Sequence, residues 1–173
     1  MDDIKDDTYY ILDASAFIGG FEVKNSSLNF TISEISEEVK DLKSKIIFDQ
    51  TIEDNYLFIE EPSKSSLDEL NKIISNSGDT LRFSTPDKKL LALAICFFNK
   101  GKSVKVVTDD YSIQNVLKIL NIPYRSVLTE GIKEVYNWKK TCQGCRKAYS
   151  DIYEDEICEI CGSKIFKKRI KLK

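Results

Sequence analysis

The sequence contains no histidine, and this absence excludes more chemistry than any other feature of its composition. A Ser-His-Asp or Cys-His nucleophile cannot be assembled, and a ribonuclease mechanism that depends on two histidines is also excluded. Imidazole cannot serve as a zinc ligand. If the chain is an enzyme, carboxylates and metal ions are the apparatus that remains.

Long apolar runs are missing too. No stretch approaches the roughly 20 apolar residues that span a bilayer. The N-terminus, residues 1–7, is acidic where a secretory signal would be basic. We therefore expect an intracellular, cytoplasmic protein with no membrane partner. At 173 residues, one medium-sized domain with a small additional module is the natural organisation.

Four of the five cysteines form two Cys-x-x-Cys pairs separated by twelve residues: Cys142, Cys145, Cys158 and Cys161. This spacing is typical of a zinc ribbon, in which four thiolates hold one structural Zn²⁺ and leave no position open for water or substrate. Two disulfides are the alternative, which an intracellular location disfavours. The fifth, Cys96, lies in an apolar helical run and is expected in the core.

The charge is unevenly distributed along the chain. Residues 1–128 carry 15 Lys and Arg against 21 Asp and Glu, a net charge of −6, whereas residues 129–173 carry 11 against 7, a net charge of +4. A basic surface beside a ribbon suggests nucleic acid as partner, although a solvated tail that aids solubility is the alternative. The candidate RNA-binding residues are Lys139, Lys140, Arg146, Lys147, Lys164, Lys167, Lys168 and Arg169.

Short apolar strands alternate with helical patterns up to residue 128, which predicts an α/β domain with a mostly parallel central sheet flanked by helices. We expect strands at 9–12, 56–59, 103–108 and 123–128. A short helical turn and loop is expected at 14–20. Helices are expected at 31–44, from there to about 54, from Ser66 to about Gly78, at 85–100 with Thr85 as N-cap, and after Asp110. The predicted organisation is a larger α/β domain at 1–128, a linker or junction helix at 129–141, the ribbon at 142–166 and a basic tail at 167–173.

Acidic residues fall where such a sheet forms its sites, at the carboxyl ends of strands. Asp13 ends the first strand, and Asp109 and Asp110 end the strand at 103–108, while Asp87 opens a helix and Glu38 lies in one. Carboxylates that converge in this way repel one another unless cations are present, and Mg²⁺ or Mn²⁺ would satisfy them. Each acid also has a purely structural interpretation, as a helix cap, a dipole partner or an exposed charge.

Several of these residues lie in recognisable motifs. Tyr-Ile-Leu-Asp-Ala-Ser-Ala-Phe-Ile at 10–18 resembles the opening motif of PIN-domain nucleases, Asp87 with Leu-Leu-Ala-Leu-Ala at 90–94 the third acid motif, and Thr-Asp-Asp at 108–110 the last. Asp110 is the better match in that last motif, and Glu38 fits the second acid. With the ribbon, the whole chain resembles the Nin-one-binding family of ribosome-biogenesis endonucleases in its short archaeal form.

The resemblance implies a metal-dependent endoribonuclease that matures the 3′ end of small-subunit ribosomal RNA within the pre-ribosomal particle, together with ribosome-assembly proteins. Asp13, Glu38, Asp87 and Asp110 would hold one or two Mg²⁺ or Mn²⁺ ions, with Asp109 assisting and Ser15 orienting a carboxylate or water. The ribbon and its basic residues would grip RNA through backbone charge more than base identity. The alternatives are a PIN-type toxin or RNA-turnover nuclease, and a non-catalytic RNA- or ribosome-binding protein.

Overall fold

The computed structural model describes residues 6–77, 83–128, 136–150, 153 and 155–171. In chain order its elements are β1 (Asp6–Leu12), α1 (Ala14–Ile18), β2 (Ser27–Thr31), α2 (Ile35–Glu38), α3 (Leu42–Glu53), β3 (Leu57–Ile59), α4 (Lys64–Ser77), α5 (Thr85–Asn99), β4 (Val104–Val107), α6 (Tyr111–Ile119), β5 (Tyr124–Arg125), β6 (Tyr136–Cys142), β7 (Ala148–Tyr149) and β8 (Ile165–Lys171).

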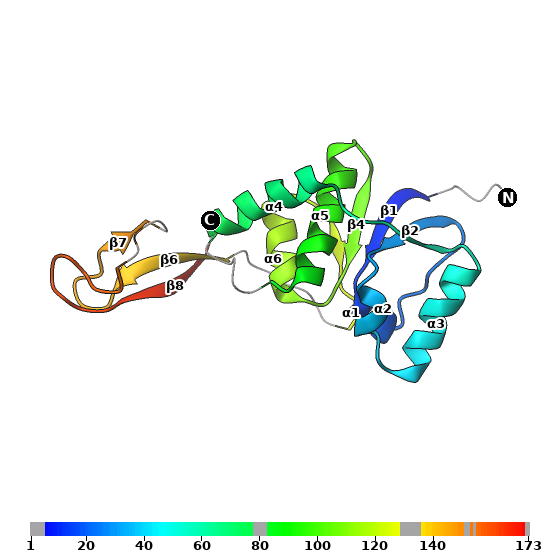
Figure 1. Cartoon of the computed structure of the whole chain (residues 1–173), viewed down its shortest axis with the longest axis horizontal. Helices are drawn as coiled ribbons and strands as arrows, with labels where there is room; N and C mark the ends of the chain where they lie inside the picture. Colours follow the sequence, from blue (N-terminus) through cyan, green and yellow to red (C-terminus); the bar gives the residue numbers. More distant parts are fainter. Residues whose placement is uncertain (1–5, 78–82, 129–135, 151–152, 154, 172–173) are drawn as a thin grey trace.

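The first five strands form one parallel sheet in the order β3-β2-β1-β4-β5. Strand β2 lies on one side of β1 and β4 lies on the other, so the direction in which strands are added reverses at β1, in the centre of the sheet. Helices α4, α5 and α6 gather on one side of this sheet and α1, α2 and α3 on the other (Figure 1). The predicted α/β class with a parallel sheet is confirmed.

The core of this domain lies where α5 packs on β1 and β4. Every residue of α5 from Leu90 to Phe97 is buried, because the helix is apolar on nearly all sides. Ser84, and not the predicted Thr85, is its N-cap: the Ser84 hydroxyl and the Asp87 carboxylate form a reciprocal capping box. The helix stops before Gly101, which takes the left-handed conformation (φ 72°).

Strand β2 was missed, since no element was expected between residues 21 and 30. The helix expected at 31–44 is also wrong: only the short α2 lies within it, and α3 already begins at Leu42. Two residues of β2 are polar and fully buried, which hides the apolar alternation of a strand. The Asn29 amide donates to the carbonyl of Tyr56 (2.9 Å), and the Thr31 hydroxyl donates to the carbonyl of Leu12 (2.8 Å). These bonds satisfy the buried groups and tie β2 to its neighbours.

Other boundaries also differ from expectation. Helix α4 begins at Lys64, so Ser66 lies inside it and is not its cap, and the predicted end at Gly78 lies outside the described residues. Strand β5 is two residues long, and not the six expected. Residues 136–141, expected in a junction helix, belong to β6, because Tyr136 to Cys142 pairs with β8 along its whole length.

The last three strands form an antiparallel sheet in the order β7-β6-β8, which lies at the opposite end of the long axis from β1 (Figure 1). The basic residues predicted as a tail therefore lie in a strand as far as Lys171. Ile165, Phe166 and Ile170 are of the β-branched and aromatic types that are enriched in strands. The domain limits themselves stay a prediction.

Candidate active site and zinc ribbon

Asp13 lies at the reversal of strand order between β1 and β4, where open parallel sheets form their crevices. It is the N-cap of α1 and is only 8% exposed. Its Oδ1 accepts the N–H of Ala14 (2.8 Å), and its Oδ2 accepts the hydroxyls of Ser15 and Thr108 (both 2.8 Å). The carboxylate is therefore held from both strands at the centre of the sheet.

The environment of Asp13 disfavours its charge. Burial raises the pKa of Asp13 above the ordinary value, even though hydrogen bonds from Thr108, Ser15 and Ala14 oppose the shift, and the negative charge of Asp87 raises it further. A cation beside this carboxylate would stabilise the charged form. Ser15 also accepts the N–H of Asp109 (3.0 Å), so its hydroxyl bridges the two strand ends.

Asp109 and Asp110 follow β4 but are bonded differently. The Asp109 carboxylate accepts the backbone N–H groups of Val127 (3.0 Å) and Leu128 (3.0 and 3.2 Å), which fastens the segment after β5. Asp110 is the N-cap of α6, and among the described residues its hydrogen bonds are accepted at Oδ1, from the N–H groups of Ser112 (2.6 Å) and Ile113 (3.2 Å). Within the part of the chain that the structure describes, Asp110 thus has an oxygen that its cap does not use, whereas both oxygens of Asp109 accept backbone N–H groups.

Glu38 and Asp87 face the same edge of the sheet from α2 and α5. Glu38 is half-buried at the end of α2, whereas its neighbour Glu37 is exposed. Burial raises the pKa of Glu38, and the negative charges of Asp13, Asp87 and Glu34 raise it further. Asp87 is half-buried, and its Oδ2 accepts the N–H of Ser84 (2.8 Å). Asp13, Glu38 and Asp87 are therefore close enough to feel one another's charge.

Among the described residues, no three of the acidic side chains lie near enough together to share one metal ion. Within the described ranges, the four cysteines are the one group of three or more acidic or thiol side chains near enough to share a metal ion. The structure brings Asp13, Glu38 and Asp87 into electrostatic contact and carries Asp109 and Asp110 to the same strand ends. The metal-binding role of these five acids stays a prediction.

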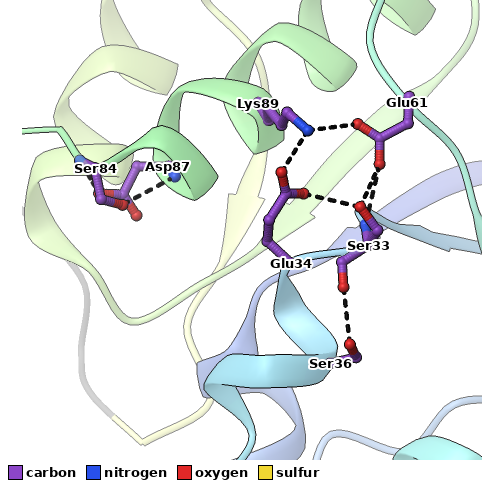
Figure 2. A network of polar contacts seen from close by, with 7 residues as sticks. All are labelled: Ser33, Glu34, Ser36, Glu61, Ser84, Asp87 and Lys89. Carbon is purple, nitrogen blue, oxygen red and sulfur yellow. Dashed lines mark hydrogen bonds and ion pairs between the residues drawn. The ribbon is translucent and has the colours of Figure 1, made fainter.

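A polar network that the sequence reasoning missed lies beside these acids (Figure 2). The Lys89 ammonium pairs with Glu34, at the start of α2, and with Glu61, after β3 (3.0 Å). The Ser33 hydroxyl lies 2.7 Å from Glu61 and 3.1 Å from Glu34, and the Ser33 carbonyl accepts the hydroxyl of Ser36 (2.9 Å). The network joins three segments of the chain next to Glu38 and Asp87.

The network holds its groups in their charged forms. The hydrogen bond from Lys89 lowers the pKa of Glu34, and the bonds to Glu34 and Glu61 raise the pKa of Lys89. Burial alone would raise the pKa of Glu61, but bonds from Ser33 and Lys89 lower it. No local signal reveals this network, because Ser33, Glu61 and Lys89 are each ordinary surface residues in the sequence and meet only through the tertiary fold.

The four paired cysteines gather as a zinc site requires. Their sulfurs lie within 4.8 Å of one another, with Cys142 and Cys161 3.3 Å apart and Cys145 and Cys158 3.6 Å apart. All are free thiols, since a disulfide would bring two sulfurs to about 2.05 Å. Tetrahedral zinc with Zn–S bonds of about 2.3 Å separates sulfurs by about 3.8 Å. The donor set and its spacing fit Zn²⁺.

Neighbouring groups shift the pKa values of these thiols. The Tyr149 hydroxyl donates to the Cys158 sulfur (2.9 Å) and lowers the pKa of that thiol, and a hydrogen bond from the Ser163 side chain lowers the pKa of Cys161 to about 5. Gly144 permits the close approach of the two knuckles, because a Cβ there would lie 2.5 Å from the Ser163 hydroxyl. These contacts favour the thiolate, the form that binds zinc, at Cys158 and Cys161. At Cys145 the hydrogen bond from the Lys147 backbone is outweighed by burial and the neighbouring cysteines, which raise the pKa to about 11.

The chain is similar to known proteins over most of its length. Residues 10–97 match a family model described as the PIN domain of ribonuclease. The chain is 45% identical to endoribonuclease Nob1 of Methanothermobacter thermautotrophicus, over 92% of each chain. It is 36% identical to endoribonuclease Nob1 of Methanocaldococcus jannaschii, over 93% of this chain and 78% of that one, and 32% identical to the Pyrococcus abyssi protein of the same name, over 90% of each. The chain belongs to the Nob1 family. The predicted resemblance is confirmed.

The residues matched by the PIN description include three of the predicted acids of this Nob1-family chain, Asp13, Glu38 and Asp87, and stop before Asp109 and Asp110. Thr108 was not among the predicted site residues, although it stands in the Thr-Asp-Asp motif. Its hydroxyl contacts Asp13 and accepts the N–H of Asp110 (3.1 Å), so it links the first acid to the last. No helix in the described ranges is long and apolar enough to cross a bilayer.

The eight basic residues predicted to bind RNA are not equivalent in the ribbon. Lys147 pairs with Glu159 and lies over the Tyr149 ring, and Lys140 donates to the Tyr153 carbonyl (2.6 Å). Lys139, Arg146, Lys164 and Lys168 are exposed, and Lys167 is exposed with a partner of its own. The side chain of Arg169 lies outside the described residues. Their role in RNA binding stays a prediction.

Proposed function

We propose that this Nob1-family chain is a Mg²⁺- or Mn²⁺-dependent endoribonuclease that matures the 3′ end of small-subunit ribosomal RNA in the cytoplasm. Its relatives carry the name endoribonuclease Nob1, and most of their length is covered by this chain. The observation that carries the proposal is Asp13: a buried carboxylate at the reversal of strand order, held by Ser15 and Thr108, with its pKa raised.

The proposal gives each acid a separate task. Asp13 is the fixed central ligand, because three donors hold its carboxylate in one orientation. Asp110 offers the oxygen that its cap does not use, and Glu38 and Asp87 complete the negative charge from α2 and α5. Ser15 orients Asp13, and Asp109 supports the site through the backbone it anchors.

A divalent cation bound by these carboxylates would lower the pKa of water and neutralise charge on the scissile phosphate. The chain's own part is to concentrate carboxylates at one edge of a rigid sheet. Products with 5′-phosphate and 3′-hydroxyl ends are expected. The proposed units are a nuclease domain at 1–128 and a zinc ribbon that begins at Cys142, with precursor RNA, the pre-ribosomal particle and its assembly proteins as partners.

The test uses the zinc-loaded full chain and an RNA that spans the 3′ end of the small-subunit ribosomal RNA and its trailer. Cleavage should require added Mg²⁺ or Mn²⁺ and should be nearly abolished in Asp13→Asn, which keeps the volume of the side chain. Glu37→Gln is the matched control on the solvent face of α2. Cleavage that needs no added divalent ion, or that survives in Asp13→Asn at the native rate, would refute the proposal.

A further inference from the structure

One face of the ribbon sheet combines an aromatic ring with cations. Strands β6 and β8 pair so that Thr141 lies opposite Phe166 and Lys139 opposite Lys168. Directly opposed residues, and residues two apart on a strand, project from the same face of a sheet. Lys139, Thr141, Phe166 and Lys168 therefore share a face, and Lys140, whose ammonium donates to Tyr153, belongs to the other.

A pocket of about 400 Å³ opens on this face, and it is lined by Thr141, Cys142, Gln143, Arg146, Phe166 and Lys168. Phe166 is 45% exposed, which is unusual for a phenylalanine. Among the described residues, the Phe166 ring has no aromatic partner, and Arg146 and Lys168 have no ion pair. The pocket thus presents a bare ring flanked by two unpaired cations.

The charges on this face repel one another as they stand. Lys139 and Lys168 are directly opposed across the strands, and like charges in that position destabilise a sheet. Arg146 adds a third positive charge, and it does so from a left-handed conformation (φ 61°) that a non-glycine residue rarely adopts. An anionic ligand would relieve this repulsion, and a planar one would also cover the ring.

We propose that this pocket binds a single unpaired nucleotide of RNA, with its base stacked on Phe166. Arg146 and Lys168 contact the flanking phosphates, and the Gln143 amide and Thr141 hydroxyl face the edge of the base. RNA bases splayed out of a helix stack on aromatic side chains in this way, and such stacking tolerates any base. The inference rests on the proposed function for its RNA, and it adds a specific base contact where binding mainly through backbone charge was expected.

Binding is measured with the zinc-loaded full chain and no added Mg²⁺ or Mn²⁺, so that affinity is read without cleavage. The probes are a labelled single-stranded RNA and an RNA duplex of the same length. Phe166→Leu should weaken binding of the single strand about tenfold, because stacking on an aromatic ring is lost. The salt dependence of single-strand binding should not change in Phe166→Leu. Lys168→Gln should flatten the salt dependence by about 0.7 in the slope of log K against log salt, the share of one phosphate on a single strand.

Phe166→Trp is the conservative variant and should bind the single strand at least as tightly as the native chain. Ile160→Ala is the matched control, since Ile160 is 65% exposed on the ribbon but outside the pocket, and it should change nothing. Duplex binding should be unaffected by Phe166→Leu. Zinc content of each variant verifies the fold, and if Phe166→Leu loses zinc, Phe166→Trp and Gln143→Ala carry the test.

Native affinity in Phe166→Leu would overturn the inference, and so would equal weakening of single-strand and duplex binding with zinc retained. Weaker single-strand binding by Phe166→Trp would do so as well. These outcomes are separate from the fate of the proposed function. If the chain cleaves RNA but changes at Phe166 leave binding unaltered, the proposed function stands and the pocket inference fails. If Phe166 contributes to binding but no cleavage occurs, the pocket inference stands and the proposed function fails.

Discussion

At the scale of single residues, neighbours in the sequence have different tasks. Asp109 and Asp110 stand side by side in the Thr-Asp-Asp motif, yet one fastens backbone and the other caps a helix with a single oxygen. The motif predicted that Asp110 matters more. It could not predict the anchoring by Asp109, because Val127 and Leu128 reach that carboxylate only after β5 has crossed over.

Changing Asp109 or Asp110 to asparagine should have opposite effects on stability and on cleavage. Asp109→Asn replaces Oδ2 with an NH₂ group that cannot accept, so the N–H of Leu128 loses its shorter bond and keeps only the longer one to Oδ1. Unfolding should become easier by about 1–3 kcal/mol. Asp110→Asn keeps the Oδ1 cap, so stability should change less while cleavage falls sharply. Urea denaturation and cleavage rates, measured together, separate the two roles, and the reverse pattern would contradict them.

Asp13 makes a prediction about pH. Its folded pKa is raised above the ordinary 3.8, so the native state binds more protons than the unfolded chain between 3.8 and that raised value. Its contribution to stability therefore falls as pH rises through this window. Without divalent ions, Asp13→Asn should lose this dependence and be at least as stable as the native chain at neutral pH.

The measurement is a series of urea denaturations from acid to neutral pH, with the native chain and Asp13→Asn compared at each step. Added Mn²⁺ should stabilise the native chain more than the variant, since an ion that binds only the folded state shifts unfolding by mass action. A native chain that gains stability over the variant as pH rises through the window would contradict the assignment.

At the scale of elements, prediction succeeded where apolar periodicity was strong. The pattern identified α5 and β4 to within a residue or two, because their buried residues form continuous apolar runs. It failed at β2, whose buried Asn29 and Thr31 depend on partners from Tyr56 and Leu12. It failed again at 136–141, where pairing with β8 imposes a strand.

The Lys89 network predicts how α2 and α5 are held together. Lys89→Met leaves Glu34 and Glu61 without their cation, and because these side chains are partly exposed the loss of stability should be small. The concentration of Mn²⁺ needed for half-maximal cleavage should rise, since Glu38 sits on the loosened α2. Lys89→Arg should restore both properties.

The pH dependence gives this prediction its sign. The lowered pKa of Glu34 contributes stability above the ordinary 4.5 that is lost as pH falls through the folded value, and the raised pKa of Lys89 contributes stability that is lost above 10.5. The difference between native chain and Lys89→Met should therefore be largest between these limits. A difference that grows toward acid pH would exclude the ion pairs as its cause.

The ribbon is the second element with a direct test. Four thiolates that bind one zinc contribute on the order of 10 kcal/mol to folding in small zinc modules. Cys145→Ser should abolish zinc binding and unfold the antiparallel sheet, while the parallel sheet keeps its own unfolding transition. Cys96→Ala is the control, because Cys96 lies in α5 and away from the cluster. Full zinc content in Cys145→Ser would remove that residue from the ligand set.

At the scale of the whole molecule, the chain separates opposite charges. The acids of the candidate site belong to a portion with a net charge of −6, and the ribbon belongs to a portion with a net charge of +4. The two sheets lie at opposite ends of the molecule (Figure 1). This asymmetry was readable from the sequence, since it needs only a count of charges. Which lysines are paired, and which line a pocket, depended on the register of β6 and β8.

The separation predicts that binding and cutting respond to different substitutions. Asp13→Asn should bind single-stranded RNA with the native affinity and salt dependence, because the ribbon cations are untouched, and should not cleave it. Lys139→Gln with Lys168→Gln should behave in the opposite way: affinity falls and the salt dependence flattens by about two phosphates. The cleavage rate at saturating RNA should change little.

Neither lysine is needed for folding, since neutralising two opposed charges removes a repulsion from the sheet. Combining the three substitutions should add the two effects without interaction, as expected for distant sites. A double lysine variant that binds normally but cuts slowly would instead show that the ribbon acts at the cleavage step.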